Sequence, residues 1–171
     1  LAEEVRQWHI LPEESSITFS ATQNDAPVKG GFSELAADIR FDPKRLEESK
    51  VQVTVVMGSV HAAYEEVSST LLTPTWFDTE AFPRGVFETH SIRQLEGNRY
   101  ETSATLRLRD KAVPLTLRFT LEEYGPERAV ISGEAILSRT AHGIGQGEWA
   151  DTSSVKDAVK VQVKVVAQSP R

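Results

Sequence analysis

The chain has 171 residues, with 19 Lys and Arg against 25 Asp and Glu and a formal net charge of -6 at pH 7. This length fits one domain with a sizeable core, and an acidic chain without a run of basic side chains argues against a nucleic-acid partner. Because the chain has no cysteine, disulfides, cysteine-bound zinc and thiol catalysis are excluded.

The N-terminal residues LAEEVRQWHI have neither the basic segment nor the apolar segment of a signal peptide. The chain begins at Leu1 rather than Met, so we expect a processed or trimmed chain from which a signal peptide has been removed. No apolar run approaches the roughly 20 residues of a membrane-spanning helix. Without a linker or an internal repeat, residues 1–171 are predicted to form a single domain.

Period-two alternation of apolar and polar residues dominates the sequence and is typical of strands with one buried and one wet face. The clearest example is VPLTLRFTLEE, and similar segments give eight or nine strands in all. In chain order the segments are SITFSATQ, GGF, LAADIRF, KVQVTVVM, GVFETHSI, RYETSATLRLR, VPLTLRFTLEE, AVISGEAILSR and VKVQVKVVAQ. Turn-forming pairs such as Asn24-Asp25, Gly97-Asn98 and Asp110-Lys111 lie between them.

Many alternating strands with short links predict an antiparallel sheet, whose edges must be covered or closed. We therefore predict an all-β fold, an eight-stranded antiparallel up-and-down barrel. A sandwich of two sheets is the alternative that periodicity alone leaves open.

One segment, SVHAAYEEVSSTLLTPTWFD, breaks the alternation. Its apolar residues at three- and four-residue spacing are Val60, Ala63, Val67 and Leu71. This spacing predicts an amphipathic helix that ends before Pro74 and lies across the barrel. Residues Asp42 to Ser49 are predicted to form one short helical turn.

The residues that most often carry chemistry form no recognisable site. The four histidines, His9, His61, His90 and His142, show no spacing that would place two metal ligands on one face. The hydrolase motif G-x-S-x-G is absent, and the G-x-G-x-G of HGIGQGEW opens no amphipathic helix, so a glycine-rich turn is favoured over a phosphate loop. We predict no catalytic residue, metal ligand or cofactor.

Three segments occur in a characteristic order, namely WFDTEAFP, ATLRLRDKAVPLTL and SRTAHGIGQGEWADT, followed by a closing valine-rich strand. Together they resemble the YceI family of lipid-binding proteins, and the resemblance covers nearly the whole chain. It implies a lipocalin-like barrel that holds an isoprenoid, such as a polyprenyl chain or a quinone tail, in an apolar bore, and export to the bacterial periplasm. The chain departs from the family pattern at Ala62, Ser68, Asp110 and His142, which concerns the entrance and the head-group contacts rather than the fold.

The inward faces of the predicted strands mix bulky and small side chains. Small residues that face one another leave a channel, whereas small residues opposite large ones fill the core, and the residues alone leave both possibilities open. With the resemblance, we predict that the inward side chains and those around the helix bind the lipid. The predicted ligand-binding residues are Phe19, Ala21, Phe32, Ile39, Phe41, Val53, Val55, Val67, Leu71, Trp76, Phe77, Phe82, Phe87, Ala104, Leu106, Leu117, Phe119, Ile131, Ala135, Leu137, Ile144 and Trp149.

Trp76, Phe77, Phe82 and Phe87 crowd around Pro83 where the helix returns to the sheet. We predict that these aromatic side chains form the wall and mouth of the bore and act as a gate. A hydrophobic plug that closes one barrel end is the alternative.

The predicted function is a periplasmic carrier, scavenger or storage protein that binds an isoprenoid lipid and exchanges it with membranes without transforming it. Two alternatives remain, an enzyme that acts on a bound lipid and a ligand-free periplasmic partner of a membrane redox protein. The sequence makes no prediction about the oligomeric state.

Overall fold

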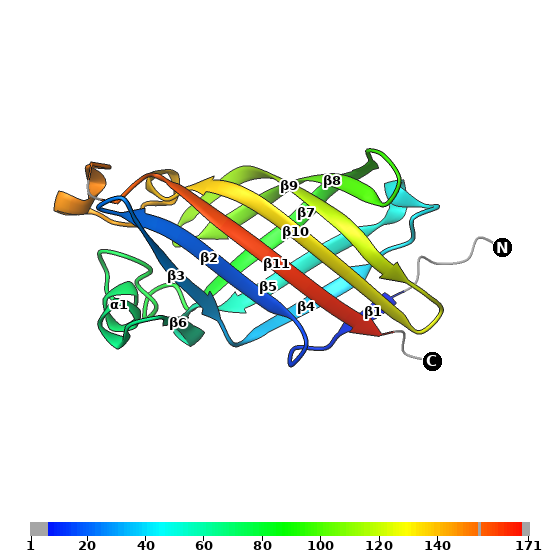
Figure 1. Cartoon of the computed structure of the whole chain (residues 1–171), viewed down its shortest axis with the longest axis horizontal. Helices are drawn as coiled ribbons and strands as arrows, with labels where there is room; N and C mark the ends of the chain where they lie inside the picture. Colours follow the sequence, from blue (N-terminus) through cyan, green and yellow to red (C-terminus); the bar gives the residue numbers. More distant parts are fainter. Residues whose placement is uncertain (1–6, 154, 169–171) are drawn as a thin grey trace.

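Antiparallel strands make up most of the structure, a computed structural model that describes residues 7–153 and 155–168 (Figure 1). The strands in this part of the chain are β1 (Gln7–Ile10), β2 (Ser16–Gln23), β3 (Ala26–Phe32), β4 (Leu35–Arg40), β5 (Lys50–Val56), β6 (Val60–Ala62), β7 (Arg84–Gln94), β8 (Arg99–Leu108), β9 (Lys111–Tyr124), β10 (Arg128–Ser138) and β11 (Ala158–Gln168). The helix is α1 (Glu65–Leu71), and the 3-10 helices are η1 (Leu46–Glu48), η2 (Met57–Ser59), η3 (Thr140–His142) and η4 (Gly147–Ala150).

The strands form one sheet that closes into a barrel. The barrel has eight strands, since three of them are interrupted and each of these carries two labels: β1 with β2, β3 with β4, and β5 with β6. β1 pairs with β11 and β4, and β4 pairs with β5; β2 pairs with β11 and β3, and β3 pairs with β6. From there β7 to β11 follow in chain order, each antiparallel to the one before. The predicted up-and-down barrel is confirmed, and the sandwich alternative is wrong because β11 closes the sheet against β1 and β2.

The interruptions lie where short polar segments break the alternation. Between β3 and β4 and between β5 and β6 the two breaks are side by side, since the amide of Val56 donates to Glu34 O (3.0 Å) and that of Ser33 to Ser59 O (3.3 Å). Between β1 and β2, the Ser15 side chain bonds the backbone of Val166 in β11 and replaces part of the ladder. Backbone groups that leave the ladder therefore find partners locally, and the barrel stays closed.

The helix is shorter than predicted. α1 has seven residues, and Val60, which helical spacing assigned to it, lies in β6 opposite Phe32. The helical prediction for residues 60–64 is wrong because these residues gain more from pairing their backbone with β3 than the local apolar spacing offers. The short turn predicted from Asp42 to Ser49 is confirmed by η1.

The two barrel ends differ. β1 and the last residues of β11 lie at one end, which we call the terminal end, and α1 with the connection between β10 and β11 lies at the other, the helix end (Figure 1). A buried group that we call the terminal cluster fills the terminal end: Trp8, Phe41, Tyr100, Phe119 and Leu121. Tyr100 and Phe119 stack at 5.3 Å between ring centroids, and Phe41 meets both rings edge-on. This end is closed by packed aromatic side chains.

Candidate functional site

An internal cavity of about 250 Å³ lies inside the barrel. Its lining comes from all eight barrel strands and from α1, and runs from Trp8 at the terminal end to Trp76 and Ile144 at the helix end. Among the described lining residues, the polar or charged side chains are Thr89, Thr102 and Arg139. An apolar cavity of about 150 Å³ already stays dry and accepts benzene, because water needs two to four polar partners. The cavity is therefore suited to an apolar molecule.

Most of the predicted ligand-binding residues are brought together around this cavity. Those that line it are Phe19, Ala21, Phe32, Ile39, Phe41, Val53, Val55, Leu71, Trp76, Phe77, Phe87, Leu106, Leu117, Phe119, Ile131, Leu137 and Ile144. Their common surface follows from period-two alternation on a closed sheet, which turns one face of every strand inward. Contact of these side chains with a lipid stays a prediction.

Five predicted residues do not line the cavity. Ala104 and Ala135 are buried in the barrel wall, but their methyl groups are shorter than the side chains opposite them, Leu115 and Val161, which do line it. The other three lie around the helix end: Val67 packs against the cluster there, Phe82 lies under the Arg109 guanidinium at 5.4 Å, and Trp149 packs on Trp76 at 5.7 Å.

Sequence reasoning missed several lining residues. The valines of β11, Val159 to Val165 at every second position, show clear alternation and could have been chosen from it. Ile92 was not predicted because a bulge between Thr89 and Ser91 shifts the inward face of β7 by one residue. Arg139 was not predicted because charged residues are almost never fully buried.

The helix end is filled by a second buried group, which we call the helix-end cluster: Met57, Val60, Leu71, Phe77 and Ile144. Phe77 is 8% exposed, and its ring lies 5.9 Å from that of Phe32. Trp76 is partly buried and lies between the Trp149 ring and the Arg139 guanidinium, which is 5.8 Å from the Trp76 ring centre. Aromatic packing thus separates the cavity from solvent at this end too.

Arg139 organises the connection between β10 and β11. Its side chain is buried, and all five of its N–H groups donate to backbone carbonyl oxygens. The acceptors are Ile144 (3.0 Å), Gly145 (3.5 Å), Asp151 (3.3 Å), Val155 (2.7 Å) and Lys156 (3.2 Å). Burial lowers the pKa of Arg139, and nearby Asp157 opposes that effect. Because every donor is used, the guanidinium shapes the cavity end rather than offering a hydrogen bond to a ligand.

Two further groups fix the same connection. His142 is buried, with Nδ1 3.2 Å from Ser138 O and Nε2 3.1 Å from Leu106 O on β8. The Asp157 carboxylate accepts hydrogen bonds from the Ser138 hydroxyl (2.7 Å) and from the Thr140 hydroxyl (2.6 Å) and amide (3.0 Å). The bonds from Thr140 and Ser138 lower the pKa of Asp157 despite its partial burial.

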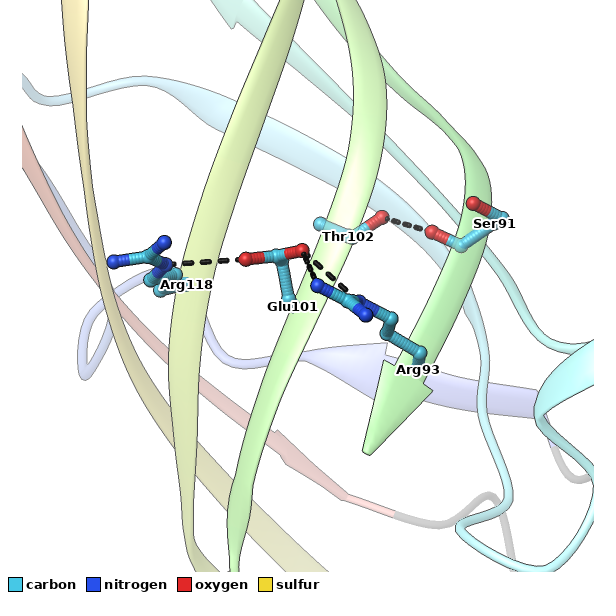
Figure 2. A network of polar contacts seen from close by, with 5 residues as sticks. All are labelled: Ser91, Arg93, Glu101, Thr102 and Arg118. Carbon is cyan, nitrogen blue, oxygen red and sulfur yellow. Dashed lines mark hydrogen bonds and ion pairs between the residues drawn. The ribbon is translucent and has the colours of Figure 1, made fainter. Parts of the chain in front are cut away.

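The hydroxyl groups of the two threonines in the cavity wall also form hydrogen bonds with backbone groups. Thr102 donates to Ser91 O at 2.8 Å (Figure 2), and Thr89 Oγ1 accepts from the Val51 amide at 3.0 Å. Among residues 7–153 and 155–168, no three His, Asp or Glu side chains are grouped as metal ligands would be. In the same part of the chain, no helix is long and apolar enough to cross a bilayer.

A closed barrel with an apolar interior and an aromatic insertion at one end matches a known family. The model of the YceI-like domain matches residues 8–167. The chain belongs to the YceI-like family. It is 26% identical over 98 residues to a UPF0312 protein of Photorhabdus laumondii subsp. laumondii, a match that spans 57% of this chain and half the length of that relative.

Solved structures share the YceI-like fold. BcnA of Burkholderia cenocepacia superposes with a TM-score of 0.87 at 26% identity, covering 92% of this chain and 98% of BcnA. The Campylobacter jejuni YceI protein gives 0.74 at 19% identity, over 83% and 85% of the two chains. A polyisoprenoid binding domain from Saccharophagus degradans gives 0.72 at 10% identity, over 98% and 100%. The last two likenesses show the fold alone.

Proposed function

We propose that this YceI-like protein binds one apolar lipid inside its barrel, most suitably an isoprenoid such as a polyprenyl chain or the tail of an isoprenoid quinone. The observation that carries the proposal is the cavity, whose lining is apolar apart from three side chains that are bonded to backbone atoms. The Saccharophagus degradans domain, described as polyisoprenoid binding, supports this ligand class for the fold.

The energetics favour carriage between membranes over capture from water. Burial of a methylene group from water yields about 0.8 kcal/mol, so a long isoprenoid taken from water would reach the ceiling of about 20 kcal/mol for non-covalent binding. A lipid that arrives from a bilayer moves from one apolar environment to another, and this term nearly cancels. Selectivity then depends on the shape of the cavity, and the lipid can be returned to a membrane.

We propose a carrier, scavenger or storage role in the bacterial periplasm, without catalysis. Export is supported by the family resemblance. The binding role is supported by the engagement of Thr89, Thr102 and Arg139 with the backbone, which leaves the cavity wall without a side chain ready for acid or base chemistry. Fractionation of cells that express the full-length gene tests the location, since recovery of the protein in the cytoplasmic fraction would contradict it.

Organic extraction of the natively purified protein, followed by mass spectrometry, tests the binding function. We expect an isoprenoid in the extract, in an amount that approaches one molecule per chain. A clean extract, together with no uptake of added polyprenyl lipid or quinone by the stripped protein, would reject the lipid-binding role. A chemically altered lipid after incubation would instead favour an enzyme.

A further inference from the structure

The ladder between β9 and β10 ends before either strand does. β9 and β10 pair from Ala129↔Tyr124 to Glu134↔Arg118 and no further, although both strands continue toward the helix end. Over the unpaired length, β10 keeps its full ladder with β11 and β9 keeps its ladder with β8. We call this stretch the seam: residues 111–117 of β9 beside residues 135–138 of β10.

The seam contains a proline, which lies four residues beyond the end of the ladder at Arg118. Pro114 in β9 has no amide hydrogen to donate, and proline in a strand is normally confined to edges. On the outer surface, Pro114 and Thr116 are exposed, and Ile136 is 60% exposed. Ile136 and Pro114 thus present apolar atoms to solvent beside the unpaired strand edges.

The seam separates the internal cavity from a groove on the outside of the barrel. The groove has a volume of about 770 Å³, and Pro114, Thr116 and Ile136 contribute to it. Three residues line both the groove and the cavity: Leu115, Phe119 and Val163. Leu115 lies in the seam, whereas Phe119 and Val163 flank Gly133 in the paired part of the wall. At Leu115, therefore, one layer of side chains without a ladder between β9 and β10 divides the apolar interior from the surface.

Polar contacts hold β9 to β8 but do not cross the seam. On the terminal side, Glu101 of β8 bonds Arg118 of β9 (3.1 Å) and Arg93 of β7 (2.6 Å), which joins three strands on the outer face (Figure 2). The carboxylate of Glu134 in β10 pairs instead with Lys160 of β11 at 3.4 Å. Within the described chain, no ion pair links β9 with β10 between Arg118 and the helix end.

His142 lies at the helix end of the seam. η3 lies against β9, and the His142 ring joins Ser138 O of β10 to Leu106 O of β8. The seam is thus bounded by the β9–β10 ladder on one side and by His142 on the other. Both barrel ends, in contrast, are filled by the terminal and helix-end clusters, whose packed side chains would have to move apart to open them.

We propose that the seam is a lateral portal through which the hydrocarbon chain of a lipid enters and leaves the cavity. This inference rests on the proposed lipid-binding function and names the route that the lipid takes. Separation of β9 from β10 at the seam displaces side chains and breaks no ladder bond, and it leads directly from the exposed Ile136 surface to the cavity lining at Leu115. A lipid chain can then pass from a membrane without crossing either aromatic cluster.

The absence of natural cysteine allows a direct test by reversible cross-linking. Continuing the Glu134↔Arg118 register by two residues places Thr116 opposite Ile136, so Thr116→Cys with Ile136→Cys spans the seam. The matched control, Thr120→Cys with Ser132→Cys, spans the paired part of the same two strands. The measurement is the rate of transfer of a fluorescent polyprenyl lipid from phosphatidylcholine vesicles to each protein, oxidised and reduced.

We expect oxidation of the seam pair to slow transfer about tenfold or more, as for other gated sites, and reduction to restore it. Protein refolded with lipid before oxidation should hold a full complement, and the control pair should transfer equally fast in both states. Equal rates for the oxidised and reduced seam pair would overturn the portal while leaving lipid binding intact. If the unmodified protein takes up no lipid, both the binding function and the portal are rejected.

A second measurement uses the unmodified chain, in case the seam cysteines do not bond or fold. Among residues 135–138 and 112–117, the amides that point toward the seam should exchange faster than the amides of residues 129–134 that bond β9, because the facing edges lack ladder bonds. Equal protection across both stretches would show a closed wall and overturn the proposal.

Discussion

At the residue scale, Arg139 shows how one buried side chain can determine the shape of a long connection. Its five donors gather carbonyl oxygens from residues 144 to 156 at the helix end of the cavity. Gly145 supports the arrangement because it has a φ of +82° and because a Cβ there would collide with the guanidinium. Folding of this connection therefore depends on a planar donor group rather than on positive charge alone.

Replacement of Arg139 by Lys should lower the free energy of unfolding by about 2–4 kcal/mol, because an ammonium group cannot reach the five carbonyl oxygens and leaves several of them buried without a donor. Urea unfolding measures the change. Arg118→Lys is the matched control, since Arg118 is exposed, and it should cost less than about 1 kcal/mol. Equal effects of the two substitutions would contradict the structural role of Arg139.

Asp157 gives this connection a pH dependence. The hydrogen bonds from Thr140 and Ser138 lower the pKa of Asp157 in the folded protein below the unfolded value of about 3.9. A lowered pKa means that the carboxylate stabilises the fold above pH 4 and that this stability is lost as the pH falls through the lowered value. Asp157→Asn should therefore cost about 1 kcal/mol at pH 7. The difference from the natural protein should shrink as the pH falls below about 4, and a difference that stays constant there would refute this account.

Two alanines in the wall offer a matched test of where the empty space lies. Ala21 of β2 lines the cavity, whereas Ala135 of β10 is 6% exposed and does not. Ala21→Phe should place its ring in the cavity, with little loss of stability and a loss of lipid capacity. Ala135→Phe should overpack the wall at a cost of about 1–3 kcal/mol. Thermal unfolding and extracted lipid are measured on the same preparations, and similar behaviour of both variants would place the cavity elsewhere.

At the scale of elements, the segment from α1 to β7 carries the aromatic side chains that were predicted to form a gate, with a plug as the alternative. The packing of Phe77 in the helix-end cluster favours the plug, since its ring is buried among residues of η2, α1 and the β10–β11 connection. Arg109 strengthens this closure from the β8–β9 hairpin by donating from Nη1 to Pro74 O (2.6 Å) and Trp76 O (2.8 Å). The segment between α1 and β7 is therefore held by the packing of Phe77 in the helix-end cluster and by the hydrogen bonds from Arg109.

Phe77→Ala should cost about 3–5 kcal/mol, as for other buried aromatic residues, and should leave the lipid transfer rate per folded molecule unchanged. Chemical unfolding and the vesicle transfer assay give the two values. Phe82→Ala is the control at the cluster's edge and should cost less, because Phe82 is only partly buried beside Arg109. Faster lipid transfer with little loss of stability in Phe77→Ala would instead support the prediction that these aromatic side chains act as a gate.

At the scale of the whole molecule, the antiparallel strands follow from the alternation of apolar and polar residues in the sequence. Alternation in segments such as VPLTLRFTLEE determines which side chains face inward, and closure into a barrel rather than a sandwich is decided by the pairing of β11 with β1 and β2. Most of the cavity lining could be predicted for the same reason, since one face of every strand must point into the barrel. The family resemblance rests on this pattern together with the aromatic insertion.

Other features depend on contacts between residues that are far apart in the sequence, and only the tertiary structure decided them. Helical spacing at Val60 gave way to pairing with β3, and the bulge in β7 changed which residues face inward. Neither the burial of Arg139 nor the unpaired edge at the seam has a local signature, because a buried charge and an interrupted ladder are set by partners far along the chain. Local patterning thus determined the antiparallel strands and the buried face of each strand, whereas pairing and packing between distant segments decided that the sheet closes, where the barrel is filled, where it is empty and where the β9–β10 ladder ends.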